Sequence, residues 1–189
     1  RFRQDGTSDS TFGPNGQGFV ALAEKGASLS DVLVDSAGRV LVTGSVDGQI
    51  FPRRDMALWR LNSDGTPDLA FGSAMQGFVT HRNAAGGNHV DHGSSLSLDA
   101  QGRIVVAGKS DKVGPPIPDS QTVVWRFKSN GALDGTFGSN GQGFVVVGNL
   151  LVGNGSDWAT GIVVDGSGRI LITGSIDNPY ALGGQYRAV

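Results

Sequence analysis

One motif occurs three times along the chain, and this repetition limits the possible folds more than any other feature of the sequence. The motif is Phe-Gly, three variable residues and then Gln-Gly-Phe-Val, and its copies occupy residues 12–20, 71–79 and 137–145. A second motif, Asp, two variable residues, Gly-Arg, an apolar run and a glycine, begins at Asp35, Asp99 and Asp165. Repetition at a long period indicates one supersecondary unit copied in tandem.

The spacing of the motifs gives the length of the unit. The Phe-Gly motifs begin 59 and 66 residues apart, and the Gly-Arg pairs are 64 and 66 residues apart. A period of roughly 63 residues divides the 189-residue chain into three repeat equivalents. We assign a partial repeat to 1–20, repeats to 28–80 and 94–147, and a partial repeat to 160–189, within one domain of residues 1–189. The two partial repeats predict a composite unit split between the termini, although a piece of a longer array would have the same ends.

Composition excludes several classes of protein. The 31 glycines indicate many turns and few long helices. A formal net charge of −2, with 15 basic and 17 acidic residues well mixed, gives no positive surface for nucleic acid or an anionic membrane. The absence of cysteine excludes disulfides and thiolate metal sites, and it fits an exported protein. No apolar run approaches the roughly 20 residues that span a membrane.

Each repeat is expected to form four short β-segments. The first, such as residues 95–99, leads into a tight turn at a glycine such as Gly102. The second, such as residues 104–106, is an unbroken β-branched run, which predicts burial on both faces. The third carries a tryptophan such as Trp125 and precedes an Asp-Gly or Asn-Gly turn. The Gln-Gly-Phe-Val stretch is the fourth, and only residues 20–25 weakly suggest a helix.

These segments fit a β-propeller, in which each four-stranded sheet is sandwiched between two neighbours. A β-sandwich would require alternation of apolar and polar residues on most strands, and only the first segment shows it clearly. We therefore predict an all-β, β-propeller-like array of about three four-stranded repeats.

The two motifs also resemble a known family. Residues 60–72, RLNSDGTPDLAFG, are similar to the R-x-N-x-D-G-x-x-D-x-x-F-G signature of the delta-60 repeat, and residues 98–108, LDAQGRIVVAG, are similar to its other half. The resemblance implies a β-propeller-like array of the kind found in tandem in large bacterial surface and secreted proteins, and it implies no activity. The chain departs from the pattern in the long loops 46–55, 81–93 and 110–121, where we expect residues specific to its function.

The turn at residues 62–68 resembles part of a calcium-binding loop. The position of Asn62, however, holds Arg3 in the first copy and Lys128 in the third, and a cation cannot be a calcium ligand. We therefore predict no metal there. The motif predicts instead that one aspartate in each copy closes an Asx turn by accepting local backbone N–H groups: Asp9, Asp68 and Asp134.

All three histidines lie in one loop beside charged residues. His-x-x-His with a carboxylate could bind zinc, but the other repeats have no equivalent, and ordering this glycine-rich loop around a metal would cost entropy. We predict no metal or cofactor and regard these side chains as ligand contacts, together with a tryptophan expected to be exposed at the start of the last repeat. The predicted ligand-binding residues are His81, Arg82, His89, Asp91, His92 and Trp158.

Two further sets of repeated residues have competing interpretations. Trp59 and Trp125, each followed by an arginine, could stack on sugar rings, but packing anchors of the core are the more common role of a repeated tryptophan. The arginines after the turn glycine are expected to tie turns together by pairing with Asp35, Asp99 and Asp165 or with the Asx-turn aspartates: Arg39, Arg103 and Arg169.

The sequence predicts a non-enzymatic, lectin-like binding or adhesion module, extracellular or on a bacterial cell surface, whose loops face a glycan or protein. The alternative is a structural subunit, a homo-oligomeric ring or filament built by exchange of incomplete repeats, such as a six-bladed dimer or a head-to-tail assembly. A second alternative is an enzyme with its site in the loop from His81 to His92, because no catalytic motif is present elsewhere. We expect no nucleic-acid partner and no membrane insertion.

Overall fold

The computed structural model describes residues 1–48, 53–87, 90–112, 119–148 and 156–176. In these residues the chain forms β-strands and one short 3₁₀ turn, Pro14–Gly16, with no α-helix. Residues 20–25 are not helical. The strands are β1 (Ser28–Val34), β2 (Val40–Asp47), β3 (Arg54–Leu61), β4 (Phe78–His81), β5 (Asp91–Leu98), β6 (Ile104–Lys112), β7 (Asp119–Phe127), β8 (Phe144–Val147), β9 (Asp157–Val164) and β10 (Ile170–Ile176).

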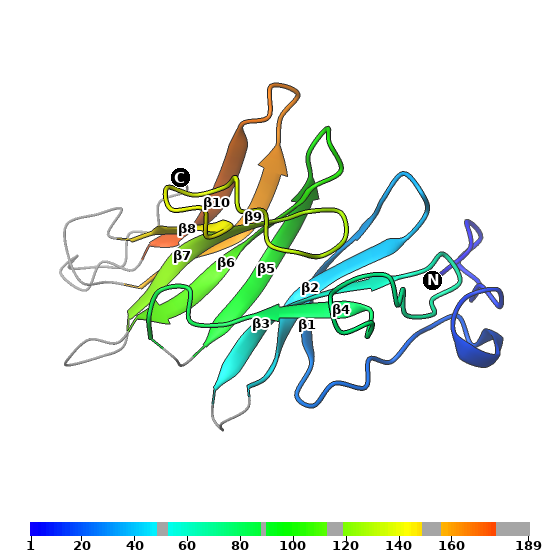
Figure 1. The fold of residues 1–189 in the computed structure, drawn as a ribbon. Helices are drawn as coiled ribbons and strands as arrows, with labels where there is room; N and C mark the ends of the chain where they lie inside the picture. Colours follow the sequence, from blue (N-terminus) through cyan, green and yellow to red (C-terminus); the bar gives the residue numbers. More distant parts are fainter. Residues whose placement is uncertain (49–52, 88–89, 113–118, 149–155, 177–189) are drawn as a thin grey trace.

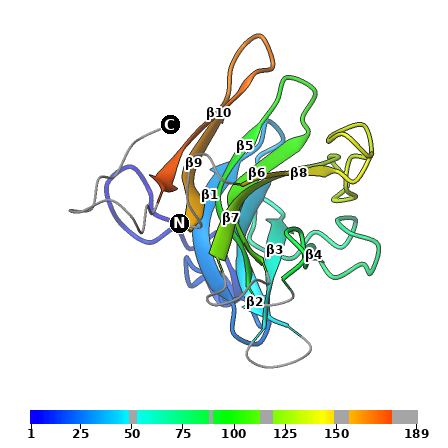
Figure 2. The same cartoon turned by 90° about the vertical axis from the view of Figure 1, so that its left-hand side faces the viewer.

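The strands form three antiparallel sheets, one for each repeat. Repeat 1 has the order β1-β2-β3-β4, repeat 2 has β5-β6-β7-β8, and the described part of repeat 3 is the pair β9-β10. The sheets stack face to face (Figures 1 and 2), with β5 packed against β1, β2 and β3, and β9 packed against β5, β6 and β7. The predicted all-β array of four-stranded, β-propeller-like repeats is confirmed.

The second strand of each complete repeat is buried on both faces, as its unbroken apolar run predicts. In β2 all residues from Leu41 to Val46 are buried, and β6 is buried over residues 104–108. Strand β10 has the same kind of sequence but alternates between exposed and partly buried residues. The difference arises because β10 belongs to the last sheet of the described stack, so one of its faces lacks a neighbour there.

The glycine that closes the Gly-Arg motif is required by a bulge in the neighbouring strand. The pairing of the first and second strands skips one residue in every repeat: Ser30, Ser94 and Thr160. The bulge brings the backbone of the first strand against the second, so a β-carbon on Gly44 would lie 1.9 Å from the carbonyl oxygen of Ser28. Gly108 and Gly174 are equally crowded. The same steric restriction therefore requires a glycine at this position in all three repeats.

The main core lies between repeats 1 and 2. Leu41 and Met56 from repeat 1 pack there with Leu96 and Trp125 from repeat 2. Trp59 and Trp125 are only 2% and 0% exposed, which decides between the two interpretations in favour of packing anchors. The interface between repeats 1 and 2 is thus an apolar layer to which both repeats contribute.

The antiparallel order separates the connections into two ends. The motif-turn end carries the turns within the β1-β2, β5-β6 and β9-β10 pairs and the Phe-Gly motifs between third and fourth strands; Figure 1 shows the three hairpin tips on one side. The variable-loop end carries the connections after β2, β4, β6 and β8. The long loops that differ from copy to copy therefore all lie at one end of the sheets.

Candidate functional site

At the motif-turn end, each copy of the Phe-Gly motif is held by one arginine, one aspartate and one phenylalanine. In repeat 1, Nε of Arg60 donates to Oδ2 of Asp68 over 2.8 Å, and the guanidinium lies 4.5 Å from the centre of the Phe71 ring. The same arrangement recurs in the other two copies: Arg1, Asp9 and Phe12, and Arg126, Asp134 and Phe137.

The aspartate of this arrangement also closes the predicted Asx turn. Oδ1 of Asp134 accepts hydrogen bonds from the hydroxyl and the backbone N–H of Thr136, at 2.8 and 3.1 Å. These bonds, with that from Arg126, lower the pKa of Asp134 to about 2. Asp9 and Asp68 accept the backbone N–H two residues on in the same way. The Asx-turn prediction is confirmed in all three copies.

The Gly-Arg turns are tied as the sequence predicts. Oδ1 of Asp35 accepts the backbone N–H groups of Ala37 and Arg39, and its Oδ2 accepts Nε of Arg39 over 2.8 Å. Burial would raise the pKa of Asp35, but these hydrogen bonds outweigh it and the pKa is lowered. The pairs Asp99–Arg103 and Asp165–Arg169 are equivalent. Arg103 also reaches Oδ2 of Asp134 at 3.5 Å, so both predicted classes of partner are used.

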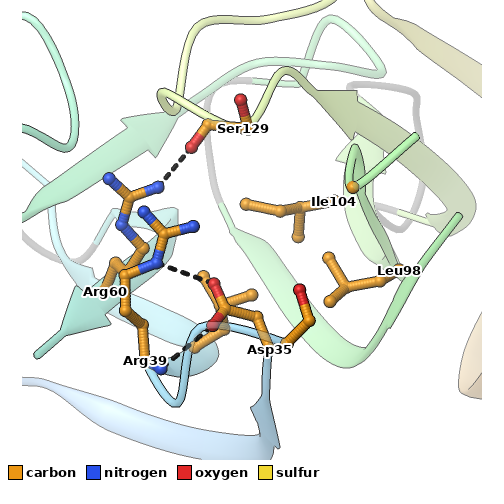
Figure 3. A pocket seen from close by; sticks show the side chains of 9 residues that line it. Asp35, Arg39, Arg60, Leu98, Ile104 and Ser129 are labelled. Atoms are coloured by element: carbon orange, nitrogen blue, oxygen red, sulfur yellow. Dashed lines mark hydrogen bonds and ion pairs between the residues drawn. The ribbon is translucent and has the colours of Figure 1, made fainter. Parts of the chain in front are cut away.

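Sequence reasoning missed that the arginine of the Phe-Gly motif in the first two copies also joins its repeat to the next one. Nη1 of Arg60 donates to the carbonyl oxygen of Ser129, and the N–H of Gly72 donates to that of Asn130 over 2.9 Å. Figure 3 shows Arg60 reaching across to Ser129 beside the Arg39–Asp35 pair. The first copy repeats this contact, because Arg1 and Gly13 donate to Ser63 and Asp64. A signal was present in the sequence, since a serine follows the third strand at both position 63 and position 129.

These groups border a cavity of about 100 Å³ between repeats 1 and 2, lined in part by Leu98 and Ile104 (Figure 3). Its arginines are engaged: Arg39 by Asp35, and Arg60 by Asp68 and Ser129. Burial, with the charge of Arg39, lowers the pKa of Arg60. The two arginines that border this cavity are therefore engaged within the protein.

At the variable-loop end, His81 contacts the next repeat. It lies on β4, and its Nδ1 accepts the indole N–H of Trp125 over 3.1 Å. The imidazole also packs against Phe144, with ring centres 4.9 Å apart. Burial lowers the pKa of His81, partly opposed by the charge of Asp55. The neutral ring is therefore favoured, as its role as an acceptor requires.

His92 lies on β5 of repeat 2 and contacts repeat 1. Its Nε2 lies 2.7 Å from the hydroxyl of Ser30, and its Nδ1 lies 2.9 Å from the hydroxyl of Ser45. Burial lowers the pKa of His92, as do the charges of Lys109 and Arg54. The described structure thus gives both histidines contacts between repeats.

Asp91 and Arg82 differ in exposure. Asp91 is 2% exposed and accepts the N–H groups of Asn83 and Ala84, so it shapes the loop before β5. Burial raises the pKa of Asp91 against the effect of these hydrogen bonds. Arg82 is exposed and acts electrostatically on Asp55. His89 lies outside the described residues.

Trp158 is half-buried and lines an apolar pocket of about 110 Å³. Residues of β7, β8, β9 and β10 form the walls, including Thr122, Val147 and Ile172. The pocket occupies the place that Trp125 fills between repeats 1 and 2, because Thr122 and Val147 correspond to Met56 and His81. Trp158 thus offers a partly accessible aromatic surface at the variable-loop end.

The five predicted ligand-binding residues that the structure describes are therefore not one cluster, because Trp158 lies on β9 of repeat 3 and the others lie where repeat 1 leads into repeat 2. The ligand role of these six residues stays a prediction. In the described residues, no three acidic, histidine or cysteine side chains come close enough to hold a metal ion. Across the same residues, no helix is long and apolar enough to cross a membrane.

Two family models match the chain in phase with the sheets. The model described as "Domain of unknown function (DUF5122) beta-propeller" matches residues 38–71 and 101–137, which run from the Gly-Arg turn to the Phe-Gly motif in repeats 1 and 2. The model described as "Beta-propeller repeat" matches residues 147–181, which include β9 and β10. No curated protein matches the chain. β-Propeller repeats of this kind indicate a binding or structural module. Both matching models are β-propeller repeats, which is consistent with the delta-60 and β-propeller repeat family.

Proposed function

We propose that the chain is an exported, non-enzymatic bacterial module that binds a glycan or a protein through its variable-loop end. The observation that carries this proposal is a difference between the two ends of the sheets. At the motif-turn end, the same residues recur in each repeat and bond to one another or to the next repeat. At the other end the loops differ between copies, which is where a rigid scaffold carries its binding residues.

Within the described part of that end, Arg82 and Trp158 are the best placed for contact. Arg82 is exposed and supplies hydrogen-bond donors, and its charge opposes the burial that raises the pKa of Asp55. Trp158 supplies an aromatic face beside an apolar pocket. A tryptophan with nearby polar groups suits the apolar face and hydroxyls of a sugar, or an apolar anchor of a protein.

Two observations support a binding module over an enzyme. His81 is the acceptor for Trp125, and His92 is held between Ser30 and Ser45. An imidazole engaged on this many sides has little freedom to act as a general base toward a substrate. Export is supported by the delta-60 resemblance, since that repeat occurs in bacterial surface and secreted proteins, and the absence of cysteine is compatible with it.

The test is a glycan array in parallel with affinity capture from a cell-surface protein extract. Each ligand found is then titrated against Arg82→Ala and Trp158→Ala. We expect at least tenfold weaker binding for one of the two variants, equivalent to about 1.4 kcal/mol. The matched control is Arg169→Ala, which removes an arginine with 78% side-chain exposure at the motif-turn end. Affinities within twofold of the unmodified chain for both variants, or a loss with the control alone, would contradict the placement.

A further inference from the structure

The two ends of the stack of sheets expose apolar side chains that are buried wherever one repeat meets another. In repeat 3, Val163 and Leu171 are 53% and 51% exposed. They occupy the positions of Leu33 and Leu41 in repeat 1, where Leu41 is 1% exposed and both residues pack against repeat 2. The face of β9 and β10 turned away from repeat 2 therefore carries apolar side chains at the positions that pack between repeats 1 and 2.

The opposite end of the stack exposes the other half of that interface. Val32 and Val34 on β1 are 61% and 62% exposed. Their counterparts in repeat 2 are Leu96, which is 4% exposed, and Leu98, and both pack against repeat 1. Leu29 is also exposed on β1. The later repeats carry smaller residues at that position, so the match there is not side chain for side chain.

These two faces are complementary because their counterparts already meet inside the chain. Leu33 and Leu41 belong to the same apolar cluster as Leu96 and Leu98. The exposed set on β9 and β10 therefore has the residues that pack against a β1-type face, and β1 has the residues that it would pack against. Figure 1 shows the N-terminal segment at the opposite end of the stack from β9 and β10, so one chain does not bring its own two faces together.

A second, polar contact is incomplete in the same direction. In the first two copies, which begin at Phe12 and Phe71, the Phe-Gly motif is covered by a turn glycine of the next repeat: a β-carbon on Gly65 would lie 3.2 Å from the Phe12 ring, and one on Gly131 would lie 3.0 Å from the Phe71 ring. Phe71 is buried by this contact, whereas Phe137, its counterpart in repeat 2, is partly exposed. Among the described residues, no acceptor is found for the N–H of Gly138 or for Nη1 of Arg126.

The N-terminal turn has the matching vacant side. Gln4, Asp5 and Gly6 correspond to Ser63, Asp64 and Gly65, whose carbonyls and glycine meet the arginine and Phe-Gly motif of the preceding repeat. A β-carbon on Gly6 would meet nothing within 4 Å, although its φ of +82° is left-handed like the +90° and +88° of its counterparts Gly65 and Gly131. The turn thus presents carbonyl acceptors that would suit Arg126 and Gly138. The open space beside Gly6 would suit the ring of Phe137.

We propose that a second copy of this chain docks head to tail, with the β9-β10 face of one copy against the β1 face of the next. The N-terminal turn of the second copy then covers Phe137 of the first. One rigid placement satisfies both contacts, because the N-terminal segment already lies against repeat 1 as a preceding repeat would: Leu22 packs there with Trp59, and Phe12 lies under Gly65. The contact is heterologous, so it generates a closed ring or a filament. It is independent of the proposed ligand.

The first test uses two variants that each block one face. Val32→Glu places a charge on the β1 face, and Leu171→Glu places one on the β9-β10 face. We expect the unmodified chain to have a mass in solution above that of one 19.5 kDa chain, by light scattering, and each variant alone to be monomeric. An equimolar mixture should form a dimer and nothing larger, because only one pair of intact faces remains. Leu69→Glu, at a side chain that is 59% exposed and outside both faces, is the control and should leave the mass unchanged.

The second test addresses the turn. Gly6→Asn keeps the left-handed conformation that asparagine tolerates but fills the cleared space, so we expect loss of association with an unchanged melting curve of the monomer. Gly102→Asn is the matched control, since Gly102 also has a positive φ and nothing within 4 Å of its β-carbon position. A monomeric unmodified chain at every soluble concentration overturns the proposal. A mixture of the two face variants that stays monomeric overturns the head-to-tail geometry, and association that survives Gly6→Asn overturns the turn contact.

Discussion

The ring of Phe71 lies against Gly131 of the next repeat so closely that a β-carbon on Gly131 would be 3.0 Å from two ring carbons. Phe12 and Gly65 repeat this contact one unit earlier, with a closest ring carbon at 3.2 Å. The phenylalanine of the Phe-Gly motif and the glycine of the following Asp-Gly or Asn-Gly turn are therefore two halves of one contact. This explains why both motifs recur in phase along the sequence.

Gly131→Ala should accordingly destabilise the protein more than an ordinary turn substitution. The change combines the left-handed backbone strain of a non-glycine residue with overpacking against a buried ring, for which we expect about 2–4 kcal/mol less free energy of unfolding. Gly102→Ala carries only the backbone strain, about 1–2 kcal/mol, because nothing lies within 4 Å of its β-carbon position. Urea denaturation of the two variants measures the difference. Equal losses would show that Phe71 accommodates the added methyl group without a further loss in the free energy of unfolding.

Arg60→Lys should be costly although it preserves the charge. Arg60 is 4% exposed and serves Asp68, Ser129 and the Phe71 ring at once, and a lysine ammonium cannot reproduce this planar set of contacts. We expect the free energy of unfolding to fall by about 2–4 kcal/mol. Arg169 is the exposed arginine of the Gly-Arg motif in repeat 3. Arg169→Lys should change the free energy of unfolding by less than about 0.5 kcal/mol. A cost for Arg60→Lys no greater than that for Arg169→Lys would contradict the role given to Arg60.

The repeat and its phase could be predicted from sequence because their causes are local. Gly102 terminates a turn, the run at residues 104–106 must be buried, and the motif aspartates such as Asp68 accept the backbone N–H two residues further on. The contacts of His81 and His92 could not be predicted in this way, because each partner lies more than 40 residues away in sequence: Trp125 for His81, and Ser45 and Ser30 for His92. A histidine in a variable loop has the same local pattern whether it faces a ligand or the next sheet.

The repeat turns should need no calcium. The carboxylates at the candidate positions already accept hydrogen bonds from arginine and from local backbone N–H groups, as Asp68 does from Arg60 and Ala70. A chelator should therefore leave the melting temperature unchanged. A specific ion at a hundredfold excess over its Kd would contribute about 2.7 kcal/mol to stability, so a clear downward shift of the melting temperature on chelation would contradict this prediction.

Stability should decrease as the pH falls below neutrality, in part through His81. Burial lowers the folded-state pKa of His81 from its ordinary value of 6.5, so the neutral ring is the form that folding favours. A group of this kind contributes its full stability above the ordinary pKa and loses it as the pH falls from there through the folded-state pKa. Protonation of Nδ1 would also remove the acceptor of the Trp125 indole N–H.

We therefore expect the free energy of unfolding, measured by urea denaturation at pH 7.5 and pH 5.5, to be lower at the acidic value. His81→Gln keeps an acceptor that does not titrate, so it should reduce this difference, whereas His92→Gln tests the separate contribution of His92, whose pKa is lowered in the same direction. An undiminished pH dependence in His81→Gln would show that His81 does not titrate with unfolding in this range.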